Sequence, residues 1–194
     1  MNRRQPHPQR LPHPQRLPRL WMMTDERQGD ALWPALARLP RGAGVVFRHY
    51  SLPPAARRAL FRKVRAIARR RGLRLLLAGP PHLAAAWGAD GSHGRREARR
   101  SIGLASAPAH DLREIRAAER AGARLLFVSP AFETRSHPHA APLGPLRFAQ
   151  LARQTALPVI ALGGMSATRA RRLGASGLYG WAAIDAWTLD GADR

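Results

Sequence analysis

Short apolar runs alternate along the chain with longer arginine- and alanine-rich segments whose apolar positions recur at helical spacing. Alternation of strand-like and helix-like segments is typical of βαβ units built around a parallel sheet. The expected strands are 20–23, 44–48, 73–78, 91–93, 101–105, 125–129, 159–162 and 178–181. The expected helices are 29–39, 55–71, 82–86, 95–99, 111–121, 145–155 and 167–173, with a short last one at 184–189.

Signals at the ends of these segments support the same division. Gly72 and Gly122 stand directly after two of the expected helices, where a glycine commonly ends a helix. Asp111 and Glu114 have the spacing of a capping box, which places the start of a helix after His110. Eight strands with helices between them predict the α/β class and a compact (β/α)8 TIM barrel over residues 19–194. A doubly wound open sheet is the alternative.

The first eighteen residues have a different character from the rest of the chain. The six residues PHPQRL, from Pro6 to Leu11, repeat at once from Pro12 to Leu17. Alternating prolines exclude a helix and remove backbone hydrogen-bond donors. We therefore expect residues 1–18 to form a disordered tail outside the barrel.

The charge of the chain is strongly positive. It carries 33 lysines and arginines against 12 acidic residues, a formal net charge of +21. The arginines are spread over the expected outer faces of helices, with Arg57 and Arg58 among them, and aromatic residues make up only 6%. Proteins that bind single-stranded nucleic acid usually interleave aromatic side chains with their positive charge. A solvated basic surface is therefore expected, and nucleic acid is not expected as a partner.

Several classes of function are excluded by what the sequence lacks. It contains no cysteine, which excludes disulfides, thiolate metal sites and cysteine nucleophiles. No apolar run approaches the roughly 18 residues needed to cross a bilayer. The segment from Met1 to Arg19 has no apolar stretch of the kind found in secretory signals. We expect a cytoplasmic protein without a membrane partner, and association of identical chains is compatible with the sequence.

The loops after strands six and seven carry the strongest chemical signal. Gly163 and Gly164 end an apolar strand, and a helix is expected to begin just beyond them. Glycines let the backbone approach an oxyanion closely, and barrels often hold a phosphate at this position. Thr134, Ser136 and His137 lie in the long loop after strand six, where hydroxyl and imidazole groups suit the same anion. An ordinary tight turn and a solvated loop are the alternatives.

His110 lies at the mouth of the expected barrel, between strand five and the following helix. A histidine there can accept and return a proton near neutral pH. The alternative is a structural residue at the start of that helix. No group of histidines and carboxylates has convincing metal-ligand spacing, so no metal site is assigned.

Stretches of sequence around these loops resemble one known family. They are, in order, LWMMTDE (20–26), FR (47–48), ADGSH (89–93), SPAFET (129–134) and PVIALGGM (158–165). Together, over residues 18–187, they resemble the thiamine phosphate synthase/TenI superfamily. The FET and GGM spellings are similar to those of the TenI branch.

The resemblance implies a TIM barrel that acts on a thiazole phosphate in thiamine biosynthesis. In the synthase, the thiazole phosphate joins an aminopyrimidine diphosphate with loss of pyrophosphate, assisted by Mg²⁺. The TenI branch includes a tautomerase that only moves a proton on the thiazole. By position, the thiazole phosphate would meet Thr134, Ser136, Gly163 and Gly164, and His110 matches the acid/base histidine of the tautomerase.

The half of the expected site that would hold the diphosphate and Mg²⁺ departs from the family. Of the Gln-x-Arg-x-Lys set after strand two, only Arg48 remains, between Val46 and Tyr50. The family's Asn-Asp after strand three reads Ala78-Gly79, and its phosphate-loop lysine reads His137. A carboxylate cage for Mg²⁺ cannot be made from alanine and glycine. A TenI-like function is therefore favoured, and a divergent synthase that uses Mg²⁺ or a non-catalytic phosphate-binding barrel are the alternatives.

Overall fold

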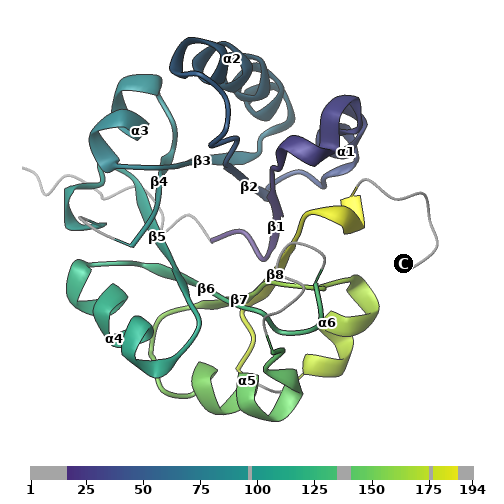
Figure 1. Ribbon diagram of the computed structural model, residues 1–194, viewed down its shortest axis with the longest axis vertical. Helices are drawn as coiled ribbons and strands as arrows, with labels where there is room; N and C mark the ends of the chain where they lie inside the picture. Colours follow the sequence, from purple (N-terminus) through teal and green to yellow (C-terminus); the bar gives the residue numbers. More distant parts are fainter. Residues whose placement is uncertain (1–16, 96–97, 135–140, 175–176, 188–194) are drawn as a thin grey trace, which may run out of the picture.

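The computed structural model describes residues 17–95, 98–134, 141–174 and 177–187, and it confirms the α/β barrel. Eight parallel strands pair in sequence order, and β8 closes the barrel against β1 (Figure 1). The strands are β1 Leu20–Met23, β2 Gly44–Phe47, β3 Arg74–Ala78, β4 Gly91–His93, β5 Leu104–Ala109, β6 Leu125–Val128, β7 Val159–Ala161 and β8 Gly180–Ala183.

Helices surround this barrel as an outer ring (Figure 1). They are α1 Leu32–Arg38, α2 Pro54–Arg71, α3 Pro81–Trp87, α4 Leu112–Ala121, α5 Gly144–Ala152 and α6 Ala167–Leu173. Three 3₁₀ helices, η1 Glu26–Ala31, η2 Ala98–Arg100 and η3 Asp185–Trp187, complete the described elements. None of these helices is long and apolar enough to cross a membrane, in the residues that the structure describes.

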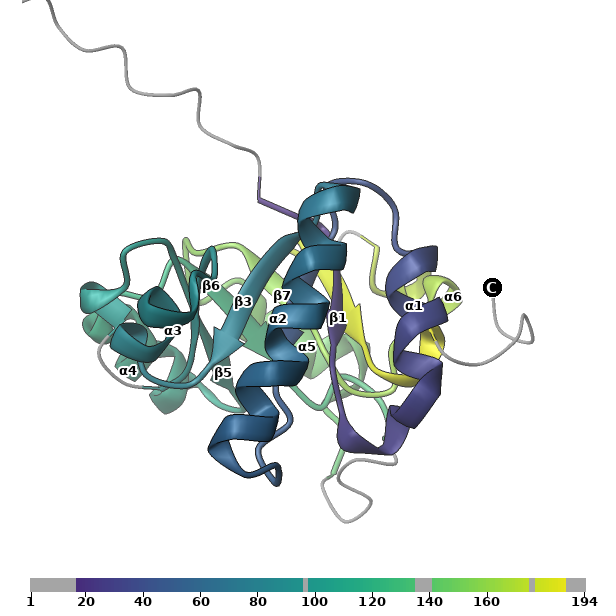
Figure 2. The same ribbon diagram turned by 90° about the horizontal axis from the view of Figure 1, so that it is seen from above.

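Successive strand residues face alternately into the barrel and toward the surrounding helices, so the protein has an inner and an outer hydrophobic core. Trp21, Val46 and Phe127 belong to a cluster that fills the inside of the barrel. Their neighbours Met22 and Val45 pack outward, in a cluster shared with residues of α1 and α2. Figure 2 looks across the barrel and shows α1 and α2 running along its wall. This layered packing fixes the directions in which the strand ends, and hence the loops beyond them, are aimed.

The amino-terminal end of the barrel is closed by Trp21 and the residues that precede β1. The Trp21 indole N–H donates to the carbonyl of Pro18 at 2.8 Å, and the Tyr179 hydroxyl donates to that of Leu17 at 2.8 Å. A Cβ on Gly44 would lie 2.1 Å from the Trp21 ring, so this strand position has room only for glycine. Packing thus begins at Leu17, and the remainder of the expected tail, residues 1–16, lies outside the described residues.

The structure corrects the expected position of strand five. The strand begins at Leu104 and ends at Ala109, whereas the sequence placed it at 101–105 because Ser106 and Pro108 have a loop-like composition. Proline is tolerated here because β4 ends opposite Ser106, so no strand on that side needs an N–H from Pro108. As a result His110 directly follows the strand.

Other corrections are smaller. The helix expected at 95–99 is represented, among the described residues, by the short 3₁₀ helix η2, and the expected helix 29–39 is divided into η1 and α1. Strand eight begins at Gly180 instead of residue 178. Residues 185–187 of the expected last helix form η3, and residues 188 and 189 lie outside the described part.

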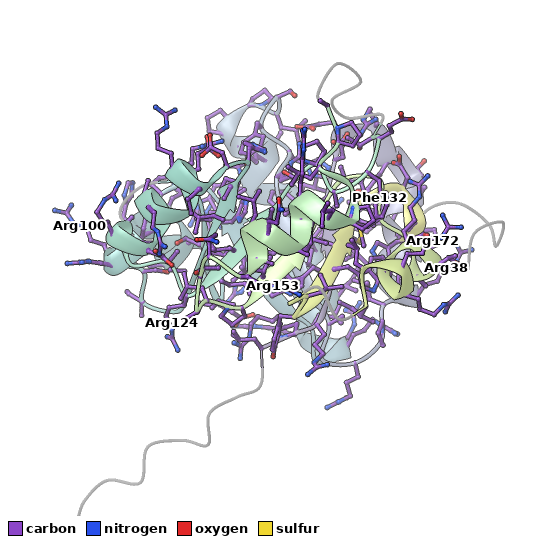
Figure 3. All side chains as sticks on the ribbon, turned by 90° about the horizontal axis from the view of Figure 1, so that it is seen from below. Arg38, Arg100, Arg124, Phe132, Arg153 and Arg172 are labelled. Carbon is purple, nitrogen blue, oxygen red and sulfur yellow. The ribbon has the colours of Figure 1, made fainter. Side chains whose placement is uncertain are left out.

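The basic surface is spread around the barrel, as expected from the sequence. Figure 3 labels five exposed arginines: Arg38 and Arg172 lie together at one edge of the view, Arg100 and Arg124 lie toward the other, and Arg153 lies between them.

Candidate functional site

The carboxyl ends of all eight parallel strands open on one end of the barrel, where functional residues of this fold gather. The described loops there form two groups of polar residues. One follows β5, β6 and β7 and contains His110 and the two glycines. The other follows β1, β2 and β3 and contains Arg48.

His110 is held at the junction of β5 and α4. Asp111 caps the helix by accepting from the backbone N–H of Glu114 at 2.7 Å, and the Glu114 carboxylate accepts from the backbone N–H of His110 at 2.9 Å. Asp111 is the expected N-cap, but Glu114 accepts from His110 instead of from Asp111 itself, so only the first half of the expected capping box is formed. The pair fixes the backbone from which the exposed imidazole of His110 projects.

The imidazole has a defined tautomer because of its main-chain partner. Its Nδ1 lies 2.7 Å from the carbonyl oxygen of Ser129, at the end of β6. A carbonyl can only accept, so Nδ1 carries the hydrogen, and in the neutral ring Nε2 is left with its lone pair. His110 thus presents a base at Nε2, which is the group needed to accept a proton from a ligand.

The two glycines after β7 pack directly against the loop after β6. Gly163 has a φ of 93°, and a Cβ there would lie 2.9 Å from the Cα of Pro130. Gly164 has a φ of 60°, and a Cβ would lie 2.1 Å from the carbonyl oxygen of Glu133. The Phe132 N–H donates to the carbonyl of Gly163 at 3.1 Å, which joins the two loops. Both glycines are therefore required for close approach between loops, a reason that the sequence did not reveal.

Beyond the glycines the chain enters α6 in the expected way. The Ser166 hydroxyl accepts from the backbone N–H of Arg169 at 3.3 Å and caps the helix. The Arg169 guanidinium donates to the carbonyl of Gly164 and lies 5.3 Å from the centre of the Phe132 ring. Figure 3 shows Phe132 on the side of the molecule where this loop emerges. The loops after β6 and β7 are thus joined to each other, and the contact between Ser129 and His110 joins them to the end of β5.

Thr134 is the last described residue of the loop after β6, and its side chain is half-buried. It follows Glu133, whose carbonyl faces Gly164, so the structure brings Thr134 into the same group as the glycines. Ser136 and His137, also expected at the phosphate, lie outside the described residues.

A second group lies where β1 and β2 end. The buried Thr24 hydroxyl accepts from the backbone N–H of Arg48 at 2.9 Å and lies 2.9 Å from Nδ1 of His49. His49 has a φ of 43° and stacks on Phe47 with ring centres 4.9 Å apart. Burial lowers the pKa of His49, which favours its neutral form. The strained backbone turns the His49 ring into the protein and leaves Arg48 and Tyr50 at the mouth.

Asp25 connects this group to η1. It accepts from Nε of Arg27 at 2.8 Å and lies 3.7 Å from the guanidinium of Arg48. Burial opposes ionisation of Asp25, but the hydrogen bonds and charge of Arg27 outweigh it and lower the pKa of this carboxyl. Asp25 is therefore an ionised partner of two arginines.

His93, at the end of β4, points into the barrel instead of into the loops. Its Nδ1 lies 3.0 Å from the Ser106 hydroxyl, and its ring meets the edge of Phe127 at 5.1 Å between centres. Complete burial lowers the pKa of His93 to about 3. It is a neutral group beneath the mouth of the barrel, and the short strand Gly91–His93 gave no sign of this in the sequence.

The magnesium site that the resemblance implies does not fit the described residues; Glu97, which could replace a carboxylate of that site, lies outside them. No group of three or more histidine, aspartate or glutamate side chains that could hold a metal exists in the described parts of the structure. At the end of β3, where a carboxylate would be needed, stand Ala78 and Gly79. The carbonyl of Ala78 instead accepts from the Arg57 guanidinium at 2.7 Å.

Arg57 corrects a sequence expectation, since it was placed among the arginines of solvated helix faces. It lies in the first turn of α2, is half-buried, and turns toward the ends of β2 and β3. The available signal was its position: the first turn of a helix that follows a barrel strand lies near the functional end of the barrel.

Comparison with known proteins gives a consistent result. Residues 23–187 match the sequence family described as thiamine monophosphate synthase. A putative thiamine-phosphate synthase 2 of Aquifex aeolicus is 30% identical, over 86% of this chain and 95% of that protein. The thiamine biosynthesis bifunctional protein ThiM/ThiE of Symbiobacterium thermophilum is 35% identical over 73% of this chain, which spans only 32% of that longer protein. A solved structure of a thiamine phosphate pyrophosphorylase from Pyrococcus furiosus has a TM-score of 0.75 at 23% identity, over 90% of this chain and 89% of that one, and shows the shared fold.

Proposed function

The chain belongs to the thiamine monophosphate synthase family, and within it we propose a TenI-like enzyme that binds a thiazole phosphate and moves a proton on the thiazole. The observation that carries this proposal is the tautomer of His110, whose Nδ1–H is committed to the Ser129 carbonyl at 2.7 Å. Nε2 is thereby left as the base on an exposed ring that directly follows β5.

In the proposed step, His110 takes one proton from the substrate and returns it to the same substrate. The neutral Nε2 of His110 takes a proton from one carbon of the thiazole system, and the imidazolium returns it to another carbon. The Ser129 carbonyl supports the imidazolium, because its hydrogen bond with Nδ1–H strengthens when the ring becomes positive. The phosphate end of the ligand would lie against the loops of Thr134, Gly163 and Gly164, with Ser136 and His137 as further candidates.

A divergent thiamine phosphate synthase is the second candidate. The names of the relatives favour it, and Arg48 is retained at the mouth of the barrel. The absence of a carboxylate at Ala78 and Gly79 argues against it, because the loss of a diphosphate leaving group requires charge neutralisation in a fixed geometry. A barrel that binds a phosphorylated thiazole without turnover is the remaining alternative.

One assay series separates these functions. The purified protein is incubated with a thiazole phosphate tautomer, with and without aminopyrimidine diphosphate and Mg²⁺, and products are followed by NMR. We expect tautomer interconversion that needs neither addition. His110→Ala should lower its rate by roughly 10²–10⁴-fold, the usual contribution of a general acid/base.

The matched control is His82→Ala, because His82 is an exposed histidine at the start of α3, outside the group of loops that contains His110. It should retain the rate of the parent protein. Formation of the coupled product in the presence of Mg²⁺ would establish the synthase instead. Saturable binding of thiazole phosphate without either reaction would establish the non-catalytic barrel.

A further inference from the structure

The Glu114 carboxylate has a separate partner on each of its oxygens. Oε2 accepts from the backbone N–H of His110 at 2.9 Å, and Oε1 pairs with Nη1 of Arg95. The backbone N–H of Glu114 is itself held by the Asp111 carboxylate at 2.7 Å. Because the two oxygens belong to one rigid plane, the guanidinium on Oε1 also orients the oxygen that binds His110.

Arg95 comes from a different strand end than His110. It follows β4 by two residues, and the N–H of the preceding Gly94 donates to the carbonyl of Ser106 at 2.9 Å. Ser106 belongs to β5, the strand that His110 directly follows. The ion pair therefore connects the end of β4 with the first turn of α4, across the strand end that carries the candidate base.

His110 is thereby held at its ring and at its backbone by different parts of the chain. The Ser129 carbonyl holds the ring at Nδ1, at 2.7 Å, and Glu114 holds the peptide N–H. A base that moves a proton between two carbons must stay in one place relative to both, and a misplacement of about 1 Å can lower a rate roughly 100-fold. Ser129 determines which nitrogen is the base, and Glu114 with Arg95 determines the position of the backbone that carries the ring.

We propose that Arg95 and Glu114 are positioning residues for the base at His110, and that their ion pair holds the His110 peptide where Nε2 reaches the substrate. The inference rests on the proton transfer proposed above, and it assigns neither residue a contact with the substrate. Both side chains are partly exposed, and ion pairs of that kind contribute little to folding stability. Loss of the pair is therefore expected to change the rate of the reaction more than the stability of the barrel.

Steady-state kinetics of tautomer interconversion test this role. Arg95→Ala and Glu114→Gln should each lower kcat by about tenfold and leave KM unchanged, because a displaced base slows the transfer without weakening binding. Glutamine keeps an oxygen that can accept from His110 but loses the charge that holds Arg95. The double variant should be no slower than the slower single one, because both changes remove the same interaction. Arg95→Lys should recover most of the rate, and Arg95→Ala should have no effect in a His110→Ala background.

Arg116→Ala is the matched control. Arg116 pairs with Glu119 at 2.9 Å farther along α4, and these side chains are 48% and 26% exposed, close to the 51% and 22% of Arg95 and Glu114. The variant removes the same charge and the same kind of ion pair, and it should retain the kcat of the parent protein. An equal loss of kcat in Arg116→Ala would overturn the proposal. So would a higher KM with unchanged kcat in Arg95→Ala, because Arg95 would then be a substrate contact.

A second measurement needs no substrate, so it separates this inference from the proposed function. Exchange of the His110 backbone amide hydrogen with water, followed by NMR, should be about two- to fivefold faster in Arg95→Ala, the range that loss of a partly exposed ion pair permits. Arg116→Ala should leave this exchange unchanged. Unchanged exchange in Arg95→Ala would overturn the positioning role even in a protein that moves the proton. Faster exchange in a protein without interconversion would support the placement of His110 and refute only the proposed reaction.

Discussion

At the scale of single residues, the proton on His110 is positioned by a main-chain carbonyl of the neighbouring strand. Since the Ser129 oxygen lies 2.7 Å from Nδ1, the neutral ring should be almost entirely the Nδ1–H tautomer. A long-range ¹⁵N–¹H correlation spectrum of the neutral ring should show a protonated Nδ1 and an unprotonated Nε2. A spectrum of the opposite tautomer, or of a rapid mixture of both, would contradict the assignment of Nε2 as the base.

His93 makes stability depend on pH in a predictable direction. Its pKa falls from 6.5 to about 3 on folding because the ring is buried. Between these values the unfolded chain binds a proton that the folded protein does not, so the stability falls as pH decreases below 6.5. The slope from this one group is about 1.4 kcal/mol per pH unit. We expect His93→Gln to remove that slope between about pH 6 and 4.

Urea denaturation at several pH values measures this slope, and His82→Gln provides the control on an exposed histidine. The control should retain the slope of the parent protein. An unchanged slope in His93→Gln would mean that the ring takes up its proton in the folded state as readily as in the unfolded chain.

At the scale of elements, Gly164 in the turn after β7 is required both by its positive φ and by the close approach of the neighbouring loop. Replacement of a glycine at positive φ strains the backbone by roughly 1–2 kcal/mol. Gly164→Ala adds a second cost, because its Cβ would lie 2.1 Å from the carbonyl of Glu133. We expect Gly164→Ala to destabilise the protein by more than this strain alone, in urea denaturation, and to weaken thiazole phosphate binding.

Gly144→Ala separates the two costs. Gly144 has a φ of 66°, close to the 60° of Gly164, but a Cβ there would meet nothing within 4 Å. It should show only the strain of the backbone and bind the ligand as before. Equal losses of stability in the two variants would show that the loops after β6 and β7 separate easily.

The sequence predicted the barrel well because the pattern of apolar runs reports burial directly. It failed at β5, where Ser106 faces inward on a hydrogen bond to His93 and Pro108 lies beyond the end of β4. Both residues reduce the apolar character of a strand whose polar groups are satisfied by neighbours. Those neighbours are distant in sequence, so the pattern within the segment could not show them.

The candidate site was predictable in part for a related reason. His110, Arg48 and the two glycines were found because each directly follows an expected strand. Arg57 was assigned to the solvent because helical position alone does not show which way a long side chain turns. Its hydrogen bonds to the carbonyls of Arg48 and Ala78 depend on how α2 lies across two strands, which only the folded structure shows.

At the scale of the whole molecule, the chain carries a formal net charge of +21, and its arginines are spread over the surface of the barrel (Figure 3). Such self-repulsion destabilises a compact state, since the same charges lie farther apart in an unfolded chain. The described ion pairs, such as that between Arg95 and Glu114, are partly exposed and offset little of it. The repulsion is also what makes any bound anion stabilising.

Screening should therefore stabilise this protein, whereas it has little effect on a protein of balanced charge. Salt at about 0.15 M shortens the distance over which charges interact to about 8 Å, which weakens repulsion between arginines on different elements. We expect the melting temperature at pH 7 to rise by roughly 2–4 °C from low salt to this concentration, equivalent to about 1 kcal/mol.

Sodium chloride and sodium fluoride should give equal shifts at equal ionic strength, because screening does not distinguish monovalent anions. A melting temperature that does not change with sodium chloride would show that the dispersed arginines do not repel one another appreciably in the folded barrel.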